Sequence, residues 1–209
     1  MSGGALTTQP ESIPAKRRQI LSGAREVFGD VGFERACVDV IAARAGVSKA
    51  TVYNHFQDKQ ALFVATVVEQ CEEMHEGLQR CLAKPAGDVE QALQRMGEQI
   101  MAVYLSPLVA GLYRHTIAEA TRFPDLGRIV FERGTLQLQQ AIASYLARLS
   151  GQGLLAVDDP ASAAVQFVAL CQGDLAARSR LGILEYPVDA QVRASVKRAV
   201  RTFLRAFGP

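Results

Sequence analysis

The sequence is poor in the residues that build metal centres and disulfide frameworks. It has four cysteines, none of them in a CxxC spacing, and three histidines, with no HExxH motif. These shortages argue against a structural zinc site, a zinc hydrolase and a disulfide-stapled scaffold. No nucleophile–base pair is visible either. We therefore expect no catalytic residue, no metal and no cofactor.

The sequence also lacks targeting and membrane-spanning patterns. Its start, MSGGALTTQPES, does not have the basic-then-apolar pattern of a signal peptide. One of its longest apolar runs, LFVATVV at residues 62–68, is far shorter than the roughly 20 residues that cross a bilayer. We expect a soluble, reduced, cytoplasmic protein without a membrane partner.

Helical periodicity is what the sequence does contain. No segment alternates apolar and polar residues as a half-buried strand does, and no internal repeat is present. Apolar residues recur at helical spacing instead, as in Ile20, Ala24, Val27 and Val31 before Gly32. We predict an all-α fold of about nine helices. Its parts are a disordered arm (1–13), a three-helix N-terminal bundle (14–60) and a larger helical domain (61–209).

Several predicted boundaries follow from caps and breakers. Asp58 is expected to cap a long fourth helix that Pro85-Ala86-Gly87 breaks, and Asp158-Asp159-Pro160 to open a helix that runs to about Leu181. After Phe123-Pro124 we expect one long helix that ends at Gly151. Its buried face is predicted to hold Phe131, Leu138, Ile142, Tyr145 and Leu149.

Residues 41–56, IAARAGVSKATVYNHF, predict a helix-turn-helix. Gly46 can take the left-handed backbone that stops the first helix, and Ser48 is a good N-cap for the second. The second helix carries hydrogen-bonding side chains that suit phosphates and base edges. The net charge is +2, and the surplus lies in residues 1–60, which have eight Lys or Arg against six Asp or Glu. A DNA partner agrees with the place and sign of that surplus.

Two longer blocks resemble the TetR family of one-component transcriptional regulators. The first runs through residues 17–68 and includes RRQILSGAREVFGDVGF and VDVIAARAGVSKATVYNHFQDKQALF. The second, EATRFPDLGRIVFERG (119–134) with GLLAVDDPASAAVQFVALCQG, resembles the AefR-like branch of that family. The resemblance implies an all-helical homodimer that binds a double-stranded DNA operator. It also implies that residues 61–209 bind a small-molecule effector and dimerise.

The resemblance assigns DNA contacts residue by residue. Tyr53 and His55 match positions that contact phosphates, Lys49 and Thr51 match positions that face bases or backbone, and Lys59 matches a phosphate contact. One departure is Cys37, since the family usually has a Thr or Ser hydroxyl here that caps the second helix. The full predicted set is Arg17, Cys37, Val38, Ser48, Lys49, Ala50, Thr51, Tyr53, Asn54, His55 and Lys59.

An effector pocket is predicted among the fourth to eighth helices. Methionine and aromatic side chains with a few polar groups suit a broad apolar ligand. For each residue the alternative is a plain core position. The candidates are Phe63, Met74, Met96, Ile100, Tyr104, Leu112, Tyr113, His115, Thr116 and Phe131.

Other residues have a structural and a functional interpretation. Cys71 and His75 could present two metal ligands on one helix face, but packing or a hydrogen bond is favoured. Cys37 could be a redox switch, but an inert small residue is favoured. We expect Glu119 and Arg122 to make an inter-helix contact. Asp174 falls inside a predicted apolar helix and needs a partner.

The last two helices are predicted to form a four-helix dimer interface. The eighth helix is apolar on more than one side, with small residues that permit close approach, and the ninth adds large apolar ones. Burial within one subunit is the alternative. The residues concerned are Ala163, Ala164, Ala169, Phe203, Leu204 and Phe207.

The predicted function is a repressor that a small molecule releases from a palindromic operator. A ligand-responsive activator remains open. A helical carrier or enzyme is a rival, but it leaves the helix-turn-helix unexplained. A general DNA-compacting protein is a second rival, and a net charge of +2 is low for it. The sequence does not identify the effector, the operator or the regulated genes.

Overall fold

The computed structural model describes residues 15–83, 87–184 and 189–209, which are helical and contain no strand. The predicted all-α fold is confirmed, with ten helices when the contiguous α7, η1 and α8 count as one. The predicted arm and most of the predicted break at 85–87 lie outside the described residues. The elements are α1 (Ala15–Arg35), α2 (Val38–Arg44), α3 (Lys49–His55), α4 (Lys59–Leu82), α5 (Val89–Tyr104), α6 (Pro107–Glu119), α7 (Pro124–Val130), η1 (Phe131–Leu136), α8 (Gln137–Gly151), α9 (Pro160–Gln172), α10 (Leu175–Arg180) and α11 (Asp189–Phe207).

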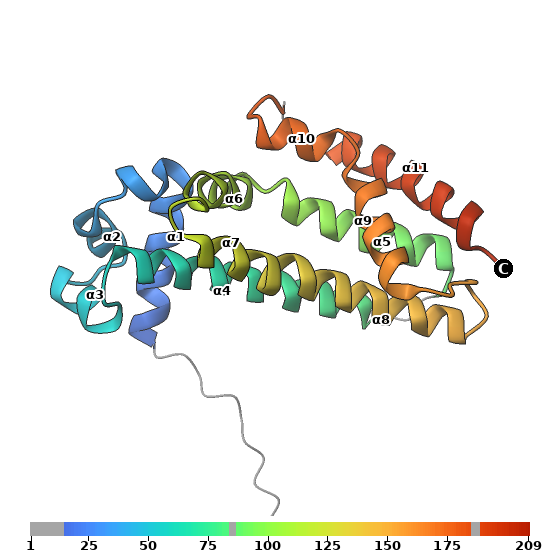
Figure 1. The fold of residues 1–209 in the computed structure, drawn as a ribbon, viewed down its shortest axis with the longest axis horizontal. Coiled ribbons are helices and arrows are strands. Elements are labelled where there is room, and N and C mark those ends of the chain that lie inside the picture. The colour runs from blue at the N-terminus through green and yellow to red at the C-terminus, as the bar shows by residue number, and fades with distance from the viewer. Residues whose placement is uncertain (1–14, 84–86, 185–188) are drawn as a thin grey trace, which may run out of the picture.

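The molecule is elongated, with the N-terminal bundle (α1–α3) at one end (Figure 1). The long helix α4 runs from this bundle beside α7 and α8, while α5, α9 and α11 pack together at the other end. Two hydrophobic clusters fill the interior. The first joins the bundle to Phe63 and Val67 of α4, Leu112 of α6 and Leu126 of α7. The second lies among α4, α5, α8, α9 and α11.

Local signals place the predicted caps as expected. The Ser48 side chain accepts a hydrogen bond from the Thr51 amide, and the Asp58 side chain accepts one from the Ala61 amide. Gly46 has a φ of 64°, the left-handed conformation that its turn requires. These three predictions are confirmed.

The long helix after Pro124 is continuous to Gly151 but contains a wide π turn, η1. Its Gly134 lies against α4, where a Cβ would be 3.2 Å from the Cys71 sulfur. Leu138 is buried as predicted, but Phe131 is 55% exposed, so its predicted place on the buried face is wrong. A π turn holds more residues than an α turn, and the helical register therefore shifts between these two positions.

The predicted single helix from residue 158 to 181 is also wrong. The Asp159 side chain caps α9 by accepting from the Ala161 and Ser162 amides, but α9 ends at Gln172. Gly173, with a φ of 47°, separates it from α10. Asp174 is consequently exposed beside this break, where its carboxylate lies 3.8 Å from an Arg178 nitrogen.

Several residues of the predicted dimer interface are buried within the subunit instead. Ala163 and Ala164 of α9 and Phe203 of α11 have relative exposures of 1%, 0% and 0%. Phe203 packs edge-on against Phe167 of α9. The alternative, burial within one subunit, therefore holds for these three. In the described part of the chain no helix has the length and apolar character needed to cross a bilayer.

Candidate functional site

Helix α3 lies at the end of the molecule (Figure 1), and most of its exposed side chains are polar. It is anchored by Val52, which is 1% exposed and belongs to the first cluster. The Ser48 oxygen that accepts from the Thr51 amide at 3.1 Å also lies 2.8 Å from the Thr51 hydroxyl. This cap fixes the start of the helix, and the buried Val52 side chain holds the helix against the bundle. The exposed residues are Lys49, Ala50, Tyr53, Asn54 and His55.

An ion pair ties α3 to the start of α2. The Lys49 ammonium donates to the Asp39 carboxylate at 3.0 Å, and the Cys37 thiol donates to the same oxygen at 3.5 Å. The hydrogen bond from Lys49 lowers the pKa of Asp39, and the same bond raises the pKa of Lys49. Cys37 occupies the N-cap position of α2 without capping it, because a cap must accept from a backbone amide and sulfur is a weak acceptor.

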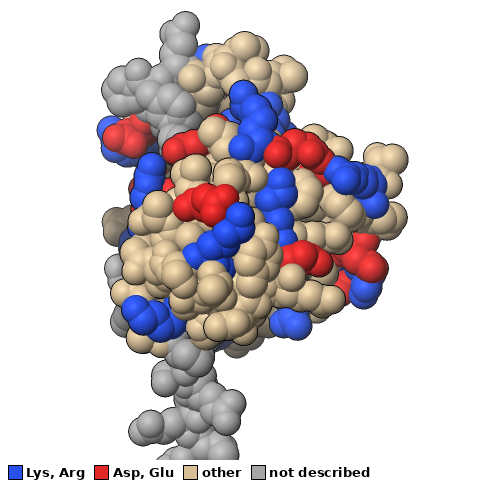
Figure 2. Space-filling model, turned by 90° about the vertical axis from the view of Figure 1, so that its left-hand side faces the viewer, with Lys and Arg blue, Asp and Glu red and all other residues tan. Residues whose placement is uncertain are grey.

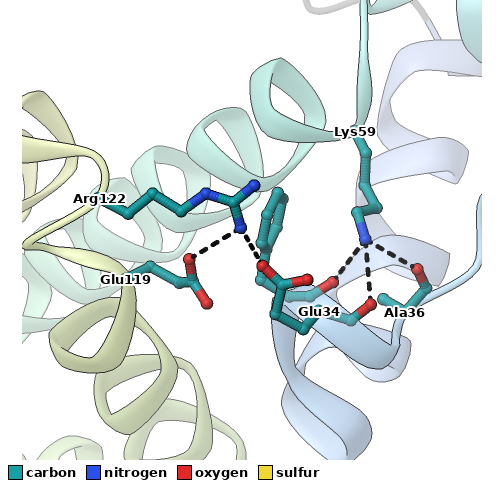
Figure 3. Close-up of polar contacts among 6 residues, drawn as sticks. Glu34, Ala36, Lys59, Glu119 and Arg122 are labelled. Carbon is teal, nitrogen blue, oxygen red and sulfur yellow. Dashed lines mark hydrogen bonds and ion pairs between the residues drawn. The ribbon is translucent and has the colours of Figure 1, made fainter.

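Lys59 is engaged with the end of α1 (Figure 3). Its ammonium donates to the carbonyl oxygens of Phe33, Glu34 and Ala36 at 2.8, 3.2 and 3.2 Å. It also lies 4.5 Å from the centre of the Phe33 ring. An ammonium has three protons to donate, so these carbonyls can occupy all of them. The structure thus gives Lys59 the geometry of a helix C-cap, not that of an open phosphate ligand.

Two further predicted DNA-contact residues are partly inside the bundle. Val38 is 7% exposed, and its side chain belongs to the first cluster. Arg17 of α1 stacks over the Phe56 ring at 5.2 Å. Basic and acidic side chains alternate over this end of the molecule (Figure 2). The small surplus of positive charge in residues 1–60 therefore does not form one uninterrupted basic patch.

The α6–α7 corner connects directly to α1. Arg122 forms an ion pair with Glu34 of α1, and its guanidinium lies 3.9 Å from Glu119 of α6 (Figure 3). The predicted inter-helix contact of Glu119 and Arg122 is confirmed. Beside it, α6 approaches α1 so closely that a Cβ on Gly111 would be 2.7 Å from the Gly29 carbonyl oxygen. The two helices are therefore in backbone contact.

A cavity lies between α4 and α6, and we call it the central cavity. Its volume is about 70 Å³, more than the roughly 10–15 Å³ that a single water requires. Helices α5, α7, α8 and α10 and the η1 turn complete its wall. The lining residues are Val67, Gln70, Cys71, Met74, Tyr104, Val109, Ala110, Leu112, Tyr113, Thr116, Val130, Gly134, Thr135, Leu138, Ala176, Ser179 and Arg180.

The structure brings part of the predicted pocket together at this cavity. Among the described residues it excludes Phe63, which packs edge-on against Phe28 at 4.9 Å, and Met96 and Ile100, which are buried in the second cluster. Phe131 points into solvent, and His115 lies against Gly32 of α1. The predicted residues that do line the cavity are Met74, Tyr104, Leu112, Tyr113 and Thr116.

Sequence reasoning predicted Thr116 but missed several other polar residues of the lining. Gln70 could have been found, because it shares a helical stripe with Val67 and Met74 at spacings of three and four residues. Ser179 and Arg180 could not, because they reach the cavity only through the unpredicted break at Gly173. Nothing in the local sequence shows where α10 turns back.

The polar groups of the central cavity have unequal partners. The Gln70 carboxamide oxygen and the Thr116 hydroxyl are buried and have no hydrogen-bond partner among the described residues. Arg180 stacks over the Tyr113 ring at 5.3 Å. Burial raises the pKa of Tyr104, and it raises that of Cys71 to about 11, so both groups are neutral at physiological pH.

Cys71 and His75 do not form part of a metal site in the described chain. Cys71 faces the central cavity, whereas His75 lines a separate groove between α4 and α8. The Nε2 atom of His75 lies 3.4 Å from the Gln79 amide nitrogen. Across the described ranges no three His, Cys, Asp or Glu side chains converge as metal ligands.

Comparisons with known proteins agree with this geometry. The model of bacterial regulatory proteins of the TetR family matches residues 20–66, and that of the AefR-like transcriptional repressor C-terminal domain matches residues 91–209. The HTH-type transcriptional repressor Rv1474c of Mycobacterium tuberculosis is 41% identical over 64 residues, which cover 31% of this chain and 34% of that protein. The HTH-type transcriptional regulator BetI of Escherichia coli is 36% identical over 80 residues, or 38% of this chain and 41% of BetI. The match thus spans less than half the length of these relatives.

Solved structures resemble nearly the whole chain. A TetR-family transcriptional regulator from Mesorhizobium loti has a TM-score of 0.84 at 27% identity, with 93% of this chain and 97% of that chain covered. The flavonoid-responsive regulator FrrA has a TM-score of 0.72 at 31% identity, with the same coverage. The chain belongs to the TetR family of bacterial transcriptional regulators and carries an AefR-like C-terminal domain.

Proposed function

We propose that the protein is a homodimeric repressor that lays α3 of each subunit in a major groove of a palindromic operator. One observation carries this proposal. The capped helix α3 is anchored to the bundle by the buried Val52, and its other side exposes five side chains at the end of the molecule. Such a helix can enter a groove without rearranging its own anchor. The repressor name of Rv1474c supports the direction of control.

The proposed DNA contacts follow the exposed surface. Ser48, Lys49, Ala50, Thr51 and Asn54 would face bases or backbone, and Tyr53 and His55 would contact phosphates. Arg17 and Cys37 border this surface, and Val38 could contribute only its backbone amide. We leave Lys59 out, because a phosphate contact would cost its three bonds to carbonyl oxygens.

The central cavity is proposed as the effector site, with α6 as the link to DNA. One face of α6 lines the cavity through Leu112, Tyr113 and Thr116. Its other contacts reach α1 through Gly111 and His115. A ligand that displaces α6 would therefore shift the bundle. It would release DNA only through a difference in affinity between the two states. The flavonoid-responsive name of FrrA supports a small-molecule effector.

We propose that two subunits associate through the outward faces of α9 and α11. Val165 and Leu170 of α9 are 47% and 37% exposed, and Ala169 between them is small and exposed. This face replaces the buried Ala163, Ala164 and Phe203 of the original prediction. An apolar helix face left in solvent suits a symmetric subunit contact.

Activation is a second candidate for the direction of control. The HTH-type transcriptional activator FasR of Mycolicibacterium smegmatis is 40% identical over 67 residues, which cover 32% of this chain and 31% of that protein. The helix-turn-helix sets where a regulator binds. Whether binding blocks or recruits polymerase depends on the position of the operator.

Selection of bound DNA from a random pool, at near-physiological salt, tests the proposed function. We expect an enriched palindrome with a binding stoichiometry of two subunits per site. A Tyr53→Ala and Asn54→Ala double variant should lose the enrichment while keeping its helical content. Binding that ignores sequence and vanishes as salt rises would contradict the proposal. A transcription assay with the selected site then separates repression from activation.

A further inference from the structure

The central cavity has a distinctive distribution of polar atoms. Most of its wall is apolar, yet it buries the Gln70 carboxamide oxygen and the Thr116 hydroxyl without partners among the described residues. Thr116 as a whole is only 3% exposed. A buried polar atom without a hydrogen bond destabilises the folded protein, so two of them in one cavity need an explanation.

The two atoms come from the two helices that frame the cavity. Gln70 lies on α4 and Thr116 on α6, and both line the same space. Neither is used to hold the helices together, because neither bonds to any described residue. A carboxamide oxygen accepts hydrogen bonds, and a threonine hydroxyl both donates and accepts. A ligand hydroxyl can serve either group.

The charges around the cavity exclude a positively charged ligand. No aspartate or glutamate is among the described residues that line it, and the phenol of Tyr104 and the thiol of Cys71 are neutral. Of the described residues that line it, Arg180 alone is charged; it is positive and stacks on Tyr113. A buried cation would therefore lose its hydration without gaining an anionic partner.

We propose that the effector of the central cavity is a mainly apolar molecule that carries a hydroxyl group and no positive charge. This inference rests on the proposed function, which makes the cavity the effector site. The apolar walls bury the body of the ligand. Its hydroxyl satisfies Gln70 and Thr116, the two polar groups that lack a partner among the described residues.

Three probes that share an ethylbenzene frame test the proposal by calorimetry on the full chain. They are 4-ethylphenol, ethylbenzene and 4-ethylbenzylamine, which is cationic at pH 7. We expect 4-ethylphenol to bind about tenfold more tightly than ethylbenzene, in line with one or two net hydrogen bonds. The amine should not bind measurably. Equal affinity for the phenol and ethylbenzene, or preferential binding of the amine, would overturn the proposal.

Matched variants show whether the preference comes from the named groups. A Gln70→Leu and Thr116→Val double variant should abolish the preference for the phenol while keeping or improving binding of ethylbenzene. A merely unfolded variant would lose both ligands. Gln79→Leu, an exposed change on the same helix, should retain the preference. Retention of the preference in the double variant would overturn the proposal.

The outcomes separate this proposal from the proposed function. If none of the probes binds while the protein still selects a palindrome, the ligand class is wrong and the regulator stands. If the phenol binds selectively but no DNA sequence is enriched, the ligand class stands and the DNA-reading function is wrong.

Discussion

The Cα of Gly111 on α6 faces the carbonyl oxygen of Gly29 on α1, and a Cβ added at residue 111 would lie 2.7 Å from that oxygen. The obstacle is backbone, so it cannot swing aside. We expect Gly111→Ala to lower the free energy of unfolding by about 1–3 kcal/mol. The matched control is Gly77→Ala inside α4, where the nearest atom is the end of the Gln99 side chain at 3.5 Å. That change should stabilise by about 0.5–1 kcal/mol. Chemical denaturation of both variants checks the pair, and equal effects would contradict the close approach of α6 to α1.

Lys59 was predicted to contact a phosphate, whereas the structure shows it capping α1. These two roles can be separated experimentally. Lys59→Met keeps an unbranched side chain but removes the donors to three carbonyl oxygens. We expect unfolding to become easier by about 2 kcal/mol. The salt dependence of DNA binding should not change, because no phosphate contact is lost. Arg133→Met, an exposed change in η1 away from both proposed interfaces, should alter neither. A slope reduced by about 0.9, without a stability change, would instead show that Lys59 binds a phosphate.

The Lys49–Asp39 pair predicts opposite effects on DNA affinity. Lys49→Gln should weaken operator binding and reduce the salt slope by about 0.9, because it removes one cation from the groove. Asp39→Asn should strengthen binding, since it releases Lys49 and removes a negative charge from the same surface. Fluorescence anisotropy across a salt series measures both. Asp189→Asn, at the start of α11, serves as the control. Weaker DNA binding by Asp39→Asn would contradict the prediction that Asp39 holds Lys49 back from the DNA.

His115 should make stability depend on pH. Burial lowers its pKa, and the nearby Arg114 and Arg35 lower it further, against an opposing contribution from Glu119. The folded protein therefore prefers the neutral imidazole, while the unfolded chain binds a proton near pH 6.5. The stabilising contribution is complete above pH 6.5 and declines as the pH falls below that value. Thermal unfolding between pH 7.5 and 5 should show a shallower decline in His115→Asn, and identical profiles would refute the assignment.

The four cysteines should differ in reactivity. Burial raises the pKa of Cys71 to about 11 and that of Cys171 to about 12, which leaves almost no thiolate at pH 8. Cys37 is exposed and Cys81 is half-buried. With a thiol-specific disulfide reagent we expect Cys37 to react first, and the two buried thiols only on unfolding. Cys37→Ser should remove the fast phase. Rapid modification of all four in the native protein would contradict the packing.

The N-terminal bundle could be predicted in detail because its signals are local. Ser48 and Asp58 each cap a helix by accepting from an amide three residues away, and Gly46 determines its own turn. Lys59 shows the limit of that reasoning. Its three partners lie 23 to 26 residues earlier in the chain, and only the folded bundle brings them within reach.

The central cavity could be predicted only in part, because helical spacing reports burial without naming the neighbour. Met96 and Ile100 share the stripe that suggested a pocket, yet α11 and α9 cover them. Phe63 belongs to an aromatic group in the first cluster. Arg180 reaches the cavity from beyond a glycine break. Tertiary packing decided each of these cases, and the sequence pattern alone does not encode it.

The π turn at η1 also sets the angle by which the face of α8 is rotated relative to that of α7. Each residue of an α-helix advances it by about 100°, so one residue more or fewer between α7 and α8 would rotate their faces by that amount. Leu126 of α7 now faces the first cluster, while Leu138 of α8 faces the second. The length of the segment from Phe131 to Leu136 thus sets the rotation of the buried face of α8 relative to that of α7, so that each face meets its own hydrophobic cluster. Deleting one residue there would turn the buried face of α8 outward without changing any side chain in either core.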